Sequence, residues 1–243
     1  MRKIGLIGGT GSLAVTGNEA RGGRPITTPY GDTSSPMLSW RTQKSVICCI
    51  IRHGLDGSIP PHLVNYRANV WALSEQSPDL VVGLNAVGGI ASTAPPAMLL
   101  FPNQLVDYTW GRAHTFADGS GRSLQHVDFT APFSEEARAV LIDAARAAGL
   151  AHHAGGTYGV TQGPRLETAA EIDRLERDGC DLVGMTAMPE AALARELGLE
   201  YAICAVVVNR AAGRGPEQGR IHDEMRRFLD TGMARARQLL AAL

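Results

Sequence analysis

The sequence predicts an α/β fold in which a mainly parallel central sheet is covered on both sides by helices. Short apolar runs rich in β-branched residues recur along the chain, and amphipathic helical patterns separate them. The chain is 44% hydrophobic and has 28 glycines among 243 residues, which suits a large core with frequent turns. Because one α/β domain can reach roughly 250 residues, we expect a single domain over residues 1–243.

Each expected element follows from its local pattern. The expected strands are Lys3–Ile7, Val46–Ile51, Asp79–Leu84, Asp181–Gly184 and Tyr201–Val208. The expected helices are Pro61–Gln76, Ser134–Ala148, Thr168–Arg177, Pro189–Leu197 and Arg220–Leu243. A serine followed by two glutamates starts the second helix, and glycines stop the second and fourth. We expect an excursion loop over Tyr108–Phe129, which is rich in Gly, Ser, His and Thr.

The charge balance excludes broad electrostatic partners. The formal net charge is −1, so we expect neither nucleic acid nor a membrane surface as a partner. No apolar run approaches the ~20 residues needed to span a bilayer, and the apolar stretch at the start is too short for a signal peptide, so we expect a cytoplasmic protein. The four cysteines show no zinc-binding spacing, and we expect small buried residues there and no metal site.

Four strand ends carry groups that could bind an anion. Gly8–Ser12 is a glycine-rich turn that includes Thr10, but Ala14 stands where a dinucleotide-binding loop needs a third glycine. Arg52 and His53 follow the second strand, where arginine could grip two phosphate oxygens and histidine could donate another hydrogen bond. The other two strand ends supply Asn85 with Ala86, and Thr186 near a helix start. Together they predict a phosphate site, although each alone is compatible with an ordinary turn.

Seven further segments form an ordered pattern along the chain: Ile7–Gly11, Thr28–Gly31, Arg52–Gly54, Val64–Asn69, Asn85–Gly88, Gly163–Thr168 and Gly184–Glu190. In these segments the chain resembles the purine nucleoside phosphorylase and methylthioadenosine phosphorylase family. The resemblance implies a purine/uridine phosphorylase-like fold with a twisted, mixed central sheet flanked by helices. It also implies purine, ribose and phosphate sites on that sheet, a homotrimer, and inorganic phosphate as co-substrate without a metal or organic cofactor.

The same resemblance assigns roles to individual residues. The phosphate ligands would be Thr10, Arg52, His53, Asn85, Ala86 and Thr186, with Met185 against the sugar. Phosphate would attack the anomeric carbon of a purine nucleoside while the departing purine carries negative charge. Asn209, Glu167 and His53 are the residues expected to take part in the chemistry, and Leu166 and Ala211 are expected to contact the substrate.

Two positions indicate which purine is bound. Asn209 stands where methylthioadenosine phosphorylases carry an aspartate, and its NH2 can donate to N7 or O6 of a 6-oxopurine. Glu167 matches the glutamate that accepts the N1–H of hypoxanthine or guanine, a proton that adenine lacks. Taken alone, each could be an ordinary turn or helix-start residue. Their joint presence favours a 6-oxopurine.

The sequence leaves more than one sugar open. The overall pattern, including Asp107–Arg112, is most similar to bacterial S-methyl-5′-thioinosine phosphorylases. However, Leu55–Gly57 lacks the His-x-His that relatives place near the sugar, and His222 replaces an apolar residue of thio-sugar enzymes. Inosine or guanosine therefore stays open as substrate, as does methylthioadenosine. Met225, and His126 of a neighbouring subunit by resemblance to the trimers, could still shape a methylthio pocket.

Two other classes stay open. Arg52–Gly54 also matches the opening of the site in histidine phosphatases, where the histidine is a nucleophile. The missing His-x-His also leaves room for a homologue that binds nucleosides without turnover. Phosphate-dependent release of free base separates all three possibilities.

Overall fold

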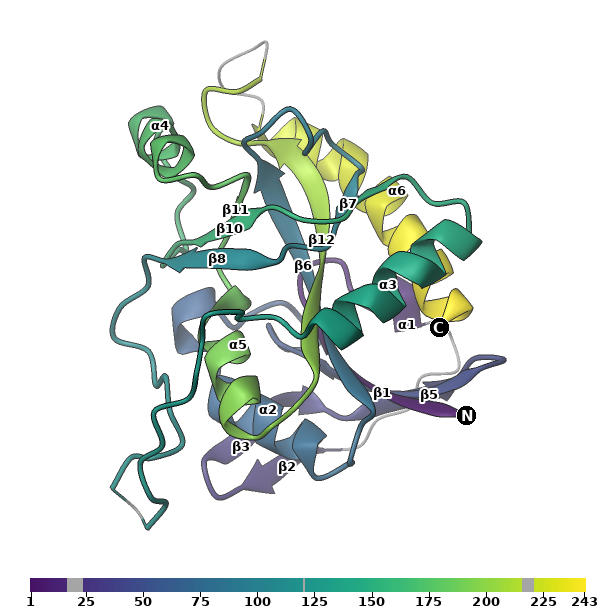
Figure 1. The fold of residues 1–243 in the computed structure, drawn as a ribbon, viewed down its shortest axis with the longest axis vertical. Helices are drawn as coiled ribbons and strands as arrows, with labels where there is room; N and C mark the ends of the chain where they lie inside the picture. Colours follow the sequence, from purple (N-terminus) through teal and green to yellow (C-terminus); the bar gives the residue numbers. More distant parts are fainter. Residues whose placement is uncertain (17–23, 120, 216–220) are drawn as a thin grey trace.

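The computed structural model describes residues 1–16, 24–119, 121–215 and 221–243. One ten-stranded sheet runs through the molecule in the order β4-β5-β1-β6-β11-β10-β8, and β12 joins it beside β6 while also pairing with β7, which pairs with β9 (Figure 1). The strands of this sheet are β1 (Arg2–Gly8), β4 (Leu38–Arg41), β5 (Ser45–Ile51), β6 (Leu80–Gly89), β7 (Leu99–Leu100), β8 (Gln104–Asp107), β9 (His152–His153), β10 (Thr157–Val160), β11 (Leu182–Gly184) and β12 (Tyr201–Arg210). A separate hairpin contains β2 (Pro25–Thr28) and β3 (Gly31–Pro36).

The sheet is mixed, as the family resemblance implies. β1 pairs in parallel with both β5 and β6, and β6 pairs in parallel with β12. β11 then runs antiparallel to the last residues of β6, and β4 runs antiparallel to β5. β7 is antiparallel to β12 and parallel to β9. The parallel centre brings the carboxyl ends of β1, β5, β6 and β12 to one edge, where ligands bind in open α/β sheets.

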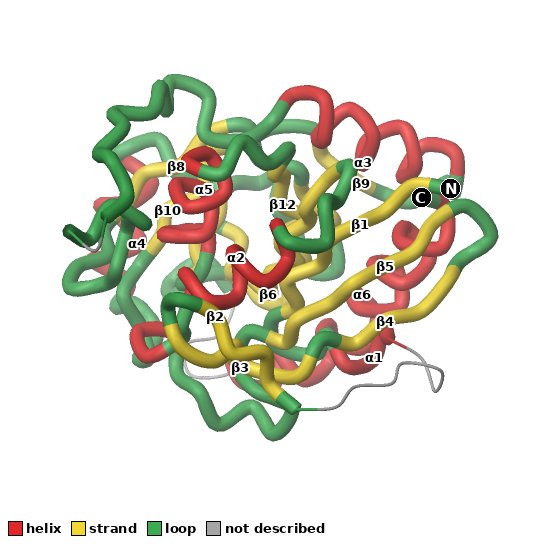
Figure 2. Tube along the Cα trace, turned by 90° about the horizontal axis from the view of Figure 1, so that it is seen from below, coloured by secondary structure: helices red, strands yellow, loops and turns green. Residues whose placement is uncertain are grey.

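Helices cover both faces of the central strands (Figures 1 and 2). The helices are α1 (Leu13–Thr16), α2 (Tyr66–Ser74), α3 (Glu135–Ala147), α4 (Ala169–Arg177), α5 (Ala187–Glu196) and α6 (Ile221–Ala242). One core lies between the sheet and α1, α3 and α6, and includes Leu6, Leu141 and Met233. A second core lies against α2 and α5 and includes Ile7 and Leu73, and a smaller cluster with Ile172 and Leu175 lies under α4. The alternation of strand residues between these two cores explains why the central strands are apolar throughout.

Local signals fix most helix ends. The Ser134 side chain accepts from the Ala137 N–H to begin α3, and Thr168 with Glu171 forms a capping box at α4. The helix expected over Pro61–Gln76 is instead a short 3₁₀ turn followed by α2. The break lies at Val64, whose backbone is extended with ψ at 131°, and Asn65 then caps the new helix.

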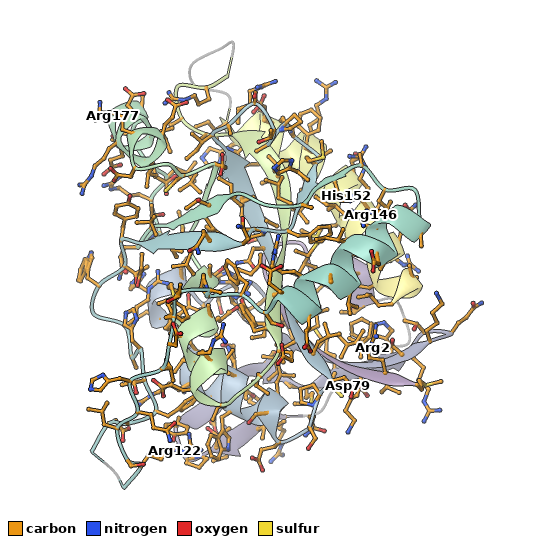
Figure 3. The ribbon with its side chains drawn as sticks, viewed as in Figure 1. Arg2, Asp79, Arg122, Arg146, His152 and Arg177 are labelled. Carbon is orange, nitrogen blue, oxygen red and sulfur yellow. The ribbon has the colours of Figure 1, made fainter. Side chains whose placement is uncertain are left out.

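The other expectations about the elements are mostly confirmed. All five expected strands are present, and the described residues between Asp107 and Glu135 form no helix or strand, as predicted for the excursion loop. The first residue of the expected last helix, Arg220, lies outside the described residues. The four cysteines are buried and unpaired. Exposed charged side chains such as Arg2, Arg146 and Arg177 lie at the periphery (Figure 3).

Candidate active site

A cavity of about 380 Å³ lies at the carboxyl ends of β1, β5, β6, β11 and β12. Most of the predicted site residues line it: Thr10, Arg52, His53, Ala86, Leu166, Glu167, Met185, Thr186, Asn209, Ala211, His222 and Met225. Asn85 and His126 lie outside its lining. The strand ends thus bring together residues from distant parts of the chain, as their positions in the sequence predict.

The turn after β1 packs directly on Arg52. A Cβ atom at Gly9 would lie 2.7 Å from Nη1 of Arg52 and 2.9 Å from the Leu84 carbonyl oxygen, so the close approach requires glycine. The N–H of Gly9 donates to that same carbonyl at 3.0 Å and extends the sheet by one bond. Thr10 is exposed and lines the cavity, which leaves its hydroxyl available to an anion.

Arg52 differs in geometry from the phosphate grip expected of it. Its guanidinium is fully buried, and Nε and Nη2 donate to the two carboxylate oxygens of Glu190 at 2.6 and 2.8 Å. Nη1 and Nη2 also donate to the carbonyls of Leu84 and Ile7, so four of the five N–H groups are used. Burial alone would lower the pKa of Arg52, but the Glu190 carboxylate outweighs it and raises this pKa. A phosphate contact through the remaining Nη1 hydrogen stays a prediction.

His53 is held in one orientation by a backbone carbonyl. Its Nδ1 lies 2.8 Å from the carbonyl oxygen of Ile59, which can only accept, so Nδ1 carries the hydrogen. Burial, and then the charge of Arg52, lower the pKa of His53 to about 4. The neutral ring therefore presents Nε2 as a hydrogen-bond acceptor, whereas the sequence suggested a donor to phosphate. The acceptor suits a P–OH group or a sugar hydroxyl.

Asn85 lies behind the cavity and contacts Thr186. Its Nδ2 donates to Oγ1 of Thr186 at 2.8 Å and lies 3.4 Å from the Tyr158 hydroxyl. Because Oγ1 of Thr186 accepts this bond, its own hydrogen is free to donate toward the cavity, where Thr186 is part of the lining. Asn85 thus orients the Thr186 hydroxyl, which is a possible donor to a ligand in the cavity.

The two residues predicted to recognise the purine lie in the same cavity. Oε1 of Glu167 accepts a hydrogen bond from the Thr161 hydroxyl at 2.6 Å, which leaves Oε2 free. Nδ2 of Asn209 donates one hydrogen to the Arg210 carbonyl at 2.7 Å, which leaves its second hydrogen and Oδ1. A register shift in β12 between Val207 and Asn209 places Val208 and Asn209 together in the lining. A free carboxylate oxygen and a free amide can therefore face one ligand.

Three of the four residues expected at the sugar, Met185, His222 and Met225, also line this cavity. Met185 packs closely under Gly163, where a Cβ would be 2.5 Å from the Met185 sulfur. His222 and Met225 come from the first turns of α6, and His222 is exposed while still lining the cavity. His126 is exposed on the excursion loop. Its expected contribution to a neighbouring subunit is not tested by a single chain.

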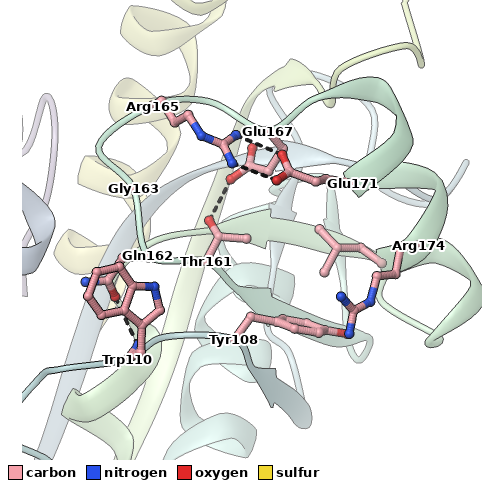
Figure 4. Close-up of a pocket in the computed structure, with 10 residues that line it drawn as sticks. Tyr108, Trp110, Thr161, Gln162, Gly163, Arg165, Glu167, Glu171 and Arg174 are labelled. Carbon is pink, nitrogen blue, oxygen red and sulfur yellow. Dashed lines mark hydrogen bonds and ion pairs between the residues drawn. The ribbon is translucent and has the colours of Figure 1, made fainter.

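A second cavity of about 310 Å³ lies beside the first (Figure 4). It shares Glu167 with the first cavity and is otherwise lined by residues such as Tyr108, Trp110 and Arg174. Figure 4 shows Thr161 bonded to Glu167, and Arg165 paired with Glu171. Glu167 therefore stands in a wall between two hollows.

Three polar residues near the site were not given a role from the sequence. Glu190 belongs to the matched segment Gly184–Glu190, and its position in that segment was the only signal for it. Tyr201 donates to Oε2 of Glu190 at 3.0 Å, and burial with the Glu190 charge raises its pKa. Arg112 ends the motif Asp107–Arg112 and lies buried near Met185. These residues do not line the cavity but bond to residues that do, or to partners of such residues. Short sequence motifs do not identify residues of this kind.

Two further properties concern the described ranges alone. Within them, no group of three or more His, Cys, Asp or Glu residues could hold a metal ion. No helix in the described part of the chain is long and apolar enough to cross a bilayer.

Hydroxyl groups next to a carboxylate and an amide, at the strand ends of a mixed α/β sheet, are the arrangement expected of a phosphorylase. The family model described as the phosphorylase superfamily matches residues 3–243. The chain therefore belongs to the phosphorylase superfamily.

Individual relatives agree with this membership. A probable S-methyl-5′-thioinosine phosphorylase of Xanthomonas campestris pv. campestris is 50% identical over 215 residues, which are 88% of this chain and 86% of the relative. The 6-oxopurine nucleoside phosphorylase of Pyrococcus furiosus is 41% identical over 218 residues, 88% of this chain and 81% of the relative. The methylthioadenosine phosphorylase of Schistosoma mansoni, solved with adenine, superposes with a TM-score of 0.92 at 31% identity, covering 100% of this chain and 90% of that one.

Proposed function

We propose that the protein catalyses the phosphorolysis of a 6-oxopurine nucleoside, with S-methyl-5′-thioinosine as the preferred substrate. The products would be hypoxanthine and 5-methylthioribose 1-phosphate. The observation that carries the proposal is that Glu167 and Asn209 line the same cavity as the hydroxyls of Thr10 and Thr186. The names of the Xanthomonas and Pyrococcus relatives support the 6-oxopurine, and the first supports the methylthio sugar.

The groups in the cavity suit each part of the reaction. A phosphate oxygen forms a bond to the anomeric carbon while the bond from that carbon to the purine nitrogen breaks, and the electron pair leaves with the purine. The free Nδ2 hydrogen of Asn209 would donate to N7 or O6 as negative charge builds there, and Oε2 of Glu167 would accept the N1–H. Holding phosphate and sugar in line removes an entropic cost of up to ~7–11 kcal/mol.

The charge at the phosphate site is unusual and fits this chemistry. Glu190 neutralises Arg52, so phosphate would be held by neutral donors and one residual N–H. A phosphate dianion in such a site keeps much of its own charge, which can stabilise the cationic sugar of the transition state. We therefore assign phosphate the role of co-substrate and propose no metal or organic cofactor.

The sugar assignment rests on weaker contrasts. Met225 offers apolar contact to a methylthio group, whereas His222 could pair with a 5′-hydroxyl, so inosine or guanosine is the second candidate. We also propose a cytoplasmic homotrimer in which His126 of a neighbouring subunit completes the sugar site. Light scattering of the purified protein and crosslinking of the His126→Cys variant would test that assembly.

A coupled assay tests the proposal. Methylthioinosine, methylthioadenosine, inosine and guanosine would each be incubated with and without phosphate, and the free base measured. We expect base release only with phosphate, and most of it from methylthioinosine. Base released equally well without phosphate would refute phosphorolysis, and phosphomonoester hydrolysis without any nucleoside would favour the histidine phosphatase. Binding without turnover would favour the non-catalytic homologue.

A further inference from the structure

Arg112 is a buried arginine on the excursion loop between β8 and α3. All of its nitrogen atoms donate hydrogen bonds. The acceptors are the carbonyls of Met185 at 2.7 Å, Met188 at 2.6 Å, Gln162 at 2.8 Å and Thr161 at 3.4 Å, the Gln162 side-chain oxygen at 3.2 Å and the Tyr66 hydroxyl at 3.3 Å. The side chain thus bonds mainly to backbone carbonyls, and these carbonyls belong to two separate segments, 161–162 and 185–188.

This cation differs from the other two buried arginines. Arg52 pairs with Glu190, and Arg138 pairs with Glu135. Arg112 forms no ion pair with a carboxylate among the residues that the structure describes. A buried charge is costly unless polar groups surround it, and here carbonyl oxygens and the nearby Tyr66 ring do so. Such an arrangement holds the segments that supply these carbonyls in fixed positions relative to each other.

The two segments that Arg112 joins carry different parts of the site. Strands β10 and β11 pair in parallel up to Val160 and Gly184, and the Thr161 N–H donates to Gly184 at 2.8 Å as the last backbone bond between them. Beyond this point one segment leads to Glu167 and the other carries Met185 and Thr186. Beyond the last backbone bond, the Arg112 guanidinium connects the two segments, because it bonds to carbonyls of the segment after β10 and of the segment after β11.

We infer that Arg112 is a positioning residue that fixes the purine-binding loop relative to the segment that binds sugar and phosphate. The inference rests on the proposed function. Arg112 does not line the cavity, so it acts through the backbone and not by touching substrate. Phosphorolysis needs purine, anomeric carbon and phosphate in line, and a misplacement of about 1 Å can cost roughly a hundredfold in rate. A lysine could keep the charge but not the planar fork that reaches both segments.

The test compares Arg112→Lys and Arg112→Ala with Arg138→Ala. Arg138 is a matched control, since it is also buried and donates to the carbonyl of Phe101, away from the cavity. All variants would be assayed with methylthioinosine and phosphate at a temperature where each is folded. We expect kcat/KM to fall about ten- to a hundredfold in both Arg112 variants and to stay within about twofold in Arg138→Ala. Millimolar guanidinium should restore part of the activity of Arg112→Ala.

Amide hydrogen exchange gives a second readout that does not depend on the substrate. In Arg112→Lys, exchange should become at least about tenfold faster in residues 162–168 and 185–188, and stay unchanged in β1 and β5. Wild-type kinetics in Arg112→Lys together with unchanged protection of both segments would overturn the positioning role. If wild type releases no base from any nucleoside, the proposed function fails, and the exchange experiment alone decides whether Arg112 holds the two segments.

Discussion

The carboxylate of Glu190 holds the guanidinium of Arg52 at two points, and neither side chain is exposed to solvent. The two residues lie 138 positions apart in the sequence, one after β5 and the other in α5. Their pairing turns an apparent phosphate-binding cation into a neutral unit that also packs under Gly9. The stability of the domain and the shape of the cavity that Arg52 lines are therefore linked through one ion pair.

Breaking this pair from one side should be severe. Arg52→Met or Glu190→Leu each leaves a buried, unpaired charge and should cost about 3–5 kcal/mol of unfolding free energy. The double variant should regain most of that stability, because both charges are gone, yet should show a strongly raised phosphate KM with little change in purine binding. Urea unfolding and phosphate titrations measure both effects. A phosphate KM equal to that of wild type in the double variant would mean that Arg52 does not contact phosphate.

The base preference should shift when the amide at position 209 becomes a carboxylate. Asn209→Asp removes the donor to a 6-oxopurine and adds an acceptor for a 6-amino group, so the ratio of kcat/KM for methylthioinosine over methylthioadenosine should fall at least about tenfold. Asn103→Asp is the control, since Asn103 lies outside the cavity and its side-chain oxygen accepts from the Gly156 N–H. Equal ratios in wild type and Asn209→Asp would remove Asn209 from base recognition.

The sugar preference should depend on His222. Replacing it with methionine should favour a methylthio group over a hydroxyl, because apolar contact is gained and a hydrogen-bond partner is lost. The expected change is roughly ten- to a hundredfold in the relative kcat/KM for methylthioinosine and inosine. His114→Met, outside the cavity, should leave the ratio unaltered. The same ratio in His222→Met would leave the sugar to Met225, His126 or Leu55–Gly57.

His53 should make stability depend on pH. Its pKa is about 4 in the folded protein, against 6.5 for an ordinary histidine, so between these values the unfolded chain binds more protons. The titration of His53 therefore leaves the free energy of unfolding unchanged above pH 6.5. As the pH falls toward 4, it lowers this free energy by up to about 3 kcal/mol. Unfolding free energies measured from pH 7 to pH 5 should fall less in His53→Gln than in wild type. His152→Gln is the control and should follow the wild-type dependence on pH. If the unfolding free energies of wild type and His53→Gln fall in parallel, the low pKa of His53 is contradicted.

The apolar central strands and the capped helices could be predicted from sequence because their signals are local. Ser134 and Thr168 mark helix starts by residue type. The run Tyr201–Val208 is apolar over its whole length, which is typical of a buried strand and not of an exposed loop. Short strands such as β10 were missed, since four residues carry too little pattern. The break at Val64 was also missed, because it depends on backbone angles that no local apolar period reveals.

Most of the cavity lining could be predicted, but the bonding of its residues could not. Arg52 and His53 are where the strand-end argument places them, yet Glu190 and Ile59 determine what each can donate. Those partners come from other parts of the chain, and no spacing rule connects them. The placement of Asn85 one layer behind Thr186 has the same origin, because the strand residue faces the interior instead of the ligand.

The cavity is assembled from strand ends and a helix that span the chain from Gly9 to Met225. Global unfolding disperses these segments, so a ligand that binds in the cavity stabilises the folded state over the unfolded one. A ligand at one hundred times its dissociation constant would then add about 2.7 kcal/mol to the stability of the entire domain. The melting temperature therefore rises with the fraction of protein that has ligand bound. A panel of nucleosides could be ranked by the melting temperatures that they produce, before any turnover is measured.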